Sequence, residues 1–64
     1  MESYGAILKK AREEKNLDYE AVYREISISK EFLKGLEEED SLIFPGEPYL
    51  IGFLKYYADF LGLD

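Results

Sequence analysis

The segment Pro48–Leu61 reads PYLIGFLKYYADFL, and it predicts the long helix around which the rest of the chain is arranged. Pro48 suits the first turn of a helix, because the N–H that proline lacks would have no partner there. Gly62 can end the helix by adopting a left-handed conformation. At 3.6 residues per turn, the apolar residues form two adjoining strips. The aromatic strip consists of Tyr49, Phe53, Tyr56 and Phe60, and the mostly aliphatic strip consists of Leu50, Leu54, Tyr57 and Leu61.

The two strips together cover about 160° of the helix surface, whereas a surface helix usually buries a stripe of roughly 100°. One interpretation is that both strips belong to the core, because large aromatic rings fill a small interior efficiently. The other is that one strip faces the core while the other contacts a second protein, since aromatic residues are enriched at interfaces. The pattern alone leaves both interpretations open, with Tyr57 assigned first to the core.

Capping residues and helical periodicity predict three shorter helices before this one, and therefore an all-α small helical bundle. The four predicted helices span about residues 4–15, 18–26, 29–39 and 48–62. The predicted caps of the first three are Ser3, Asp18 and Ser29. The residues predicted to point inward from those helices are Tyr4, Ile7, Leu8, Ala11, Ala21, Val22, Ile26, Phe32, Leu33 and Leu36.

Several other features of the first 47 residues carry an expectation. We expect Arg12 on the solvent-facing side of the first helix, and the acidic run Glu37–Asp40 at the solvated end of the third. We expect the apolar segment Leu42–Phe44 to tuck under the last helix. Gly35 inside a helix costs about 1 kcal/mol relative to alanine, which indicates a close crossing with another helix.

The composition limits the classes of function. A chain of 64 residues forms one domain, here residues 1–64, near the lower size limit for folding unaided. With no cysteine and no histidine it offers neither thiol chemistry nor the usual zinc ligands, and no serine has a recognisable activating base. We therefore expect no enzymatic activity, no cofactor and no metal. No apolar stretch reaches the roughly 18 residues of a membrane span, and the N-terminus does not resemble a signal peptide.

The second and third predicted helices, joined by Glu25–Ser29, form a helix-turn-helix pattern. With the preceding LKKAREEKNLDYEAV, this half resembles the lambda-repressor-like family of DNA-binding domains. The third helix would then be the recognition helix, but the segment Ser29–Asp40 carries two basic and five acidic residues, a sum of −3. The whole chain carries −6. Because contacts to phosphates need clustered cations, we expect a helix-turn-helix that does not bind DNA, with a DNA-binding regulator as the alternative.

The second half carries EEED at residues 37–40, FPG at residues 44–46 and the run PYLIGFLKYYADFLGLD at residues 48–64. These motifs resemble the cytoplasmic domain of the RodZ family of bacterial cell-shape proteins. The resemblance implies a non-enzymatic adaptor on the cytoplasmic side of the bacterial inner membrane. In that family the domain precedes a basic linker and one transmembrane helix, and it binds filaments of the bacterial actin homologue MreB. The chain would then be the N-terminal part of a longer membrane protein.

In the RodZ family the last helix carries the filament contact. The motif places this role on Tyr49 and Phe53, and helical geometry extends it to Tyr56 and Phe60. The remaining candidates for the interface are Lys30 and Lys34. Many relatives have a polar or basic residue where this chain has Ile51 and Tyr56, which predicts additional apolar exposure here.

Overall fold

The computed structural model describes residues 2–63 and contains four α-helices and one short 3₁₀ turn. The helices are α1 (Tyr4–Glu14), α2 (Tyr19–Ile26), α3 (Lys30–Glu38) and α4 (Glu47–Phe60), and the 3₁₀ turn is η1 (Ser41–Ile43). No strand occurs in this part of the chain. The predicted all-α fold is confirmed, and each predicted helix end lies within two residues of the observed one.

Side-chain caps begin the first three helices, as predicted. The backbone N–H of Ala6 donates to the Ser3 hydroxyl, that of Ala21 to the Asp18 carboxylate and that of Phe32 to the Ser29 hydroxyl. Each cap supplies a partner for an N–H that has none inside its helix, at about 1 kcal/mol. These local bonds explain why the helix starts could be found from the sequence.

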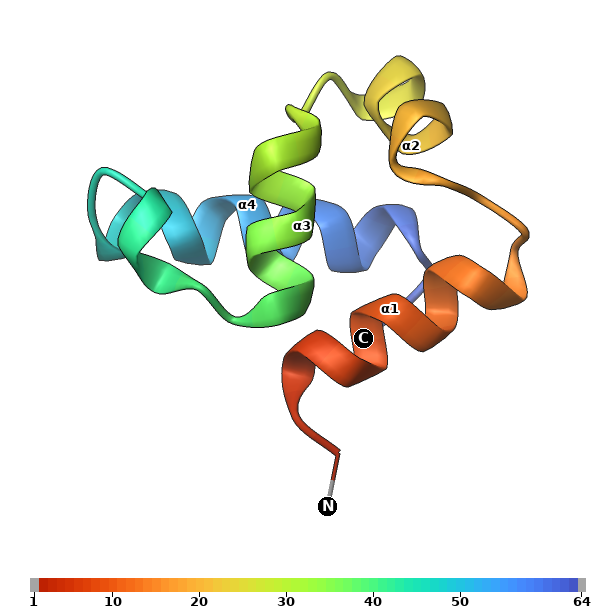
Figure 1. Ribbon diagram of the computed structural model, residues 1–64, viewed down its shortest axis with the longest axis horizontal. Coiled ribbons are helices and arrows are strands. Elements are labelled where there is room, and N and C mark those ends of the chain that lie inside the picture. The colour runs from red at the N-terminus through yellow and green to blue at the C-terminus, as the bar shows by residue number, and fades with distance from the viewer. Residues whose placement is uncertain (1, 64) are drawn as a thin grey trace.

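Helix α3 lies at the centre of the bundle, where it packs against α1 and α2 and crosses α4 (Figure 1). The central position explains why Leu33 and Leu36 of α3 are fully buried. The core residues are Leu8, Val22, Ile26, Ile28, Leu33, Leu36, Phe44, Tyr57 and Leu61. The assignment of Tyr57 to the core is therefore confirmed.

Gly5 allows a close approach between two helices. A Cβ atom at that position would collide with the backbone oxygen of Glu37, so α1 and α3 come together where no side chain intervenes. The expected helix crossing at Gly35 was wrong, because a Cβ there would instead meet the side chain of Ile43 in η1.

Two predicted inward side chains are more exposed than expected. Leu42 is 92% exposed, because η1 turns only Ile43 and Phe44 toward the other helices. Ile7 is 40% exposed at the edge of α1, beside the buried Leu8. Among the residues described, no helix has the length and apolar character needed to cross a membrane.

Candidate functional site

The two tyrosines at the outer edge of α4 are the most exposed aromatic side chains of that helix. Tyr49 is 57% exposed and Tyr56 is 50% exposed, although each carries a large apolar ring. They lie about two turns apart on the same side of α4, so their rings belong to one surface. We call Tyr49 and Tyr56 the outer tyrosines.

The other two members of the predicted aromatic strip are partly buried and pack against the core. Phe53 lies in an aromatic cluster, with its ring centroid 5.1 Å from that of Phe32 and 6.0 Å from that of Phe44. The rings of Phe32 and Phe44 stack at 5.0 Å. Phe53 therefore joins α4 to α3 and to the segment after η1, and only part of its ring remains accessible.

Helical geometry explains this division of the strip. Measured around the helix axis from the buried Tyr57, Phe53 lies at about 40°, Phe60 at about 60°, Tyr49 at about 80° and Tyr56 at about 100°. Exposure increases in that direction, from the buried Tyr57 through two partly buried phenylalanines to the outer tyrosines. The structure thus divides the strip: Phe53 and Phe60 pack against the core, whereas Tyr49 and Tyr56 are exposed.

The candidate lysines lie on another surface. Lys30 and Lys34 are exposed on α3, at least about 160° around that helix from Phe32, the residue that contacts Phe53. The Nζ of Lys30 donates to a Glu20 carboxylate oxygen at 2.8 Å, and this partner raises the pKa of Lys30. The structure therefore does not bring the two lysines beside the outer tyrosines.

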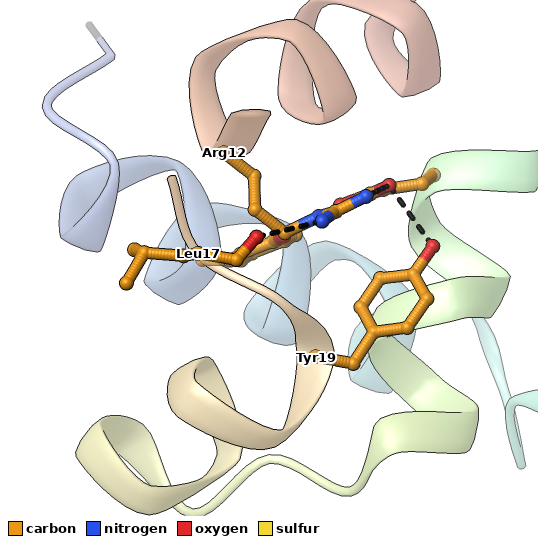
Figure 2. Close-up of polar contacts among 5 residues, drawn as sticks. Arg12, Leu17 and Tyr19 are labelled. Carbon is orange, nitrogen blue, oxygen red and sulfur yellow. Dashed lines mark hydrogen bonds and ion pairs between the residues drawn. The ribbon is translucent and has the colours of Figure 1, made fainter. Parts of the chain in front are cut away.

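A buried polar network connects all four helices, and sequence reasoning missed it. The Arg12 guanidinium of α1 donates to both carboxylate oxygens of Glu37 in α3, from Nε at 2.7 Å and from Nη2 at 3.0 Å. Tyr19 of α2 donates to the same carboxylate at 3.0 Å, and Tyr57 of α4 donates at 2.6 Å. Figure 2 shows Arg12 and Tyr19 converging there, with a further bond from Arg12 Nη1 to the backbone oxygen of Leu17 at 2.8 Å.

The network leaves its charges fully partnered. Burial by itself would raise the pKa of Glu37, but the hydrogen bonds from Arg12, Tyr57 and Tyr19 outweigh it and hold that pKa below its usual value. Burial and the bond to Glu37 raise the pKa of Tyr19 to about 12. Among residues 2–63 no buried side-chain nitrogen or oxygen lacks a hydrogen-bond partner. A buried ion pair is tolerated when all of its polar atoms have hydrogen-bond partners.

The expectations that Arg12 faces solvent and that Glu37 belongs to a solvated helix end were both wrong. Both residues are buried, because each lies on the inward side of its helix: Arg12 one turn after Leu8 and Glu37 one turn after Leu33. That spacing was a usable signal, since it places opposite charges on the buried faces of two helices. The solvated part of the acidic run is Glu38–Asp40.

Comparison with known proteins identifies the fold. A family model described as a helix-turn-helix domain matches residues 7–64. The match continues beyond the two helices of the motif through α4 to the end of the chain. No curated protein and no solved structure matches the chain significantly.

Proposed function

Because the chain belongs to this family of helix-turn-helix domains, we propose that it uses the fold as a non-enzymatic adaptor that binds filaments of the bacterial actin homologue MreB. The alternative use of the same fold is DNA binding. The surface chemistry of α3 and α4 distinguishes the two.

The exposure of the outer tyrosines is the observation that carries the proposal. Tyr49 and Tyr56 leave half or more of their surface in water and lie beside the partly buried Phe53 and Phe60. Tyrosine is enriched where proteins bind one another, because it buries an apolar ring and keeps a polar hydroxyl. Two exposed tyrosine rings thus lie beside two phenylalanine rings that are packed against the core. This arrangement suits the centre of a contact with a partner protein.

The outer face of α3 supports protein binding over DNA binding. Its exposed residues are Lys30, Glu31, Lys34 and Glu38, two of each sign, and one of the lysines is paired with Glu20. The exposed Glu39 and Asp40 follow directly. A recognition helix needs cations toward the phosphates, whereas this one presents no excess of positive charge.

The choice of MreB and the link to the membrane rest on the resemblance to the RodZ family. The motif that carries this resemblance contains Tyr49 and Phe53 within α4. Whether Lys30 and Lys34 take part is a separate proposal, because they form a different surface. They would extend the contact only if the filament reaches around α3.

The test is co-sedimentation of MreB filaments with a Tyr49→Ala, Tyr56→Ala double variant. Interface energy concentrates in a few aromatic residues at about 2 kcal/mol or more each, so binding should weaken about thirtyfold or more for each of the two rings removed. Tyr23→Ala is the matched control, since Tyr23 is 45% exposed but lies on α2, and it should bind as the wild type does. Phe53 is less informative, because removal of a ring from the aromatic cluster also destabilises the fold.

Thermal melting of the same variants separates binding from folding. The double variant should melt close to the wild type, because half or more of each side chain is exposed. Undiminished co-sedimentation by a folded double variant would exclude the outer tyrosines as the contact. Duplex DNA binding below micromolar concentration at about 0.15 M salt would favour the DNA-binding alternative, since nonspecific binding is typically weaker than that.

A further inference from the structure

A second surface of α4, separate from the outer tyrosines, is also left uncovered. A groove of about 380 Å³ runs between α1 and the C-terminal half of α4. Its lining is apolar except for Lys55 and Asp59. The apolar lining residues are Tyr4, Ile7, Leu8, Leu54, Ala58 and Leu63.

The two charged lining residues can pair with the same two residues of a second copy related by a two-fold axis. Lys55 and Asp59 are exposed, carry opposite signs and lie one turn apart on α4. Within residues 2–63 neither forms an ion pair. In a symmetric dimer one surface meets a copy of itself, so residue i contacts residue j and residue j contacts residue i. An antiparallel pair of α4 helices can therefore form the Lys55–Asp59 ion pair twice.

We infer that this face of α4, with the adjoining groove, binds a second copy of the chain in an antiparallel two-fold dimer. If Lys55 of one copy faces Asp59 of the other, Ile51 of one copy lies beside the chain that follows α4 of the other, which ends at Phe60 and leads to Leu63. Ile51 is 46% exposed, and Leu63 lines the groove. The dimer thus supplies an apolar side chain for an apolar groove as well as a partner for each charge.

The backbone permits the close approach that this contact needs. A Cβ atom added at Gly52 would meet nothing within 4 Å, so the surface there is open. The register that pairs Lys55 with Asp59 places Gly52 of one copy beside the end of α4 in the other, and Gly52 has no side chain to separate the two copies.

The dimer leaves the proposed filament surface free. Lys55 lies about 100° and Asp59 about 60° around α4 from Tyr56, whereas Tyr49 is about 20° farther from both and near the other end of the helix, so the ring of Tyr49 remains accessible in both copies. The inference goes beyond the filament proposal and does not depend on it. Where both hold, one dimer presents two tyrosine surfaces related by the two-fold axis.

The contact is small, and we expect a weak dimer. A standard interface buries about 800 Å² on each partner, which would be roughly a fifth of the 4445 Å² surface of this chain. One helix face and a shallow groove offer less than that. Each copy also carries a net charge of −6, which opposes association.

The test is analytical ultracentrifugation of the wild type and two charge-reversal variants, at concentrations up to about 1 mM and about 0.15 M salt. Lys55→Glu and Asp59→Lys should each weaken dimerisation at least tenfold, because each places two pairs of like charges at the axis. An equimolar mixture of the two variants should associate again, since both pairs in the mixed dimer have opposite signs. This recovery requires that residue 55 of one copy contacts residue 59 of the other.

Overall charge makes the opposite prediction for one variant. Lys55→Glu changes the net charge from −6 to −8, whereas Asp59→Lys changes it from −6 to −4. General repulsion would therefore make Asp59→Lys associate more strongly than the wild type. Circular dichroism should show both variants folded, because the two residues are exposed and outside the ion pairs described.

Tyr49→Ala is the control for the other surface and should dimerise as the wild type does. A wild type that stays monomeric at about 1 mM overturns the inference. So does a dimer that is insensitive to both charge reversals, or a mixture of the two variants that fails to associate.

Discussion

Helices α3 and α4 cross in one core but distribute charged and apolar residues in opposite ways. Helix α3 buries a carboxylate, Glu37, while its outer face is charged. Helix α4 buries the ring of Tyr57, while its outer surface keeps Tyr49, Ile51 and Tyr56 exposed. The hydrogen bond from the Tyr57 hydroxyl to Glu37 joins the two helices directly.

Contacts within the fold explain the buried charge of α3 but not the exposed aromatic rings of α4. The buried charge of α3 has four hydrogen bonds and an ion-pair partner, so folding alone accounts for it. The exposed rings of α4 have no comparable structural reason, because water is a poor environment for them. A partner protein on α4 would therefore account for a feature that the fold leaves unexplained, whereas a partner on α3 would not.

Removal of the negative charge from Glu37 should have the largest effect on stability. Glu37→Gln leaves the Arg12 guanidinium buried without its counter-ion, and breaking a buried pair in this way costs about 3–5 kcal/mol. For a chain of 64 residues that is about a third to all of the free energy of unfolding, at about 0.05–0.15 kcal/mol per residue. Urea denaturation measures the change.

The neighbouring exposed carboxylate provides the control for that variant. Glu38→Gln should change the free energy of unfolding by no more than about 0.5 kcal/mol, as is usual at the surface. Equal effects at the two positions would contradict the assignment of Glu37 as the centre of the network.

Alanine at two helix glycines should shift stability in opposite directions. Gly5→Ala forces a methyl group against the backbone oxygen of Glu37, and overpacking at such a site costs about 1–3 kcal/mol. Gly52→Ala meets open space in α4 and should stabilise the chain by up to about 1 kcal/mol through helix propensity. Thermal melts of both variants test whether α1 and α3 approach as closely as described. A neutral Gly5→Ala would argue against that approach.

The link between α3 and α4 can be tested through one hydroxyl group. Tyr57→Phe keeps the buried ring but removes the donor to Glu37, and a bond to a charged group contributes about 1.5–3 kcal/mol. Tyr56→Phe removes the same atom from an exposed ring and should be within about 0.5 kcal/mol of the wild type. Chemical denaturation of this pair should show the loss only for Tyr57→Phe.

Acid should weaken the same network. The folded chain holds the pKa of Glu37 below the ordinary value of 4.5, so its contribution to stability is present above that pH. The contribution is lost as the pH falls through the folded pKa, when the carboxylate becomes protonated. An NMR titration of the Glu37 side chain should therefore show a midpoint below 4.5. A midpoint at or above 4.5 would mean that burial outweighs the hydrogen bonds.

Local signals in the sequence determined the helices. The caps at Ser3, Asp18 and Ser29 act within three residues, and the spacing of apolar residues reports the buried side of each helix. The core position of Tyr57 followed from the same periodicity. These features were predictable because each depends on residues close together along the chain.

Contacts between distant residues were decided only by the tertiary structure. Periodicity places Arg12 and Glu37 on inward faces, but the two charges meet because α1 crosses α3 at Gly5. Similarly, Phe53 is held by Phe32 and Phe44, whereas Tyr49 is left exposed. Helix geometry fixes the direction in which each side chain points from the helix axis. How far neighbouring elements cover that side chain depends on their packing, and this coverage separates a core residue from an exposed one.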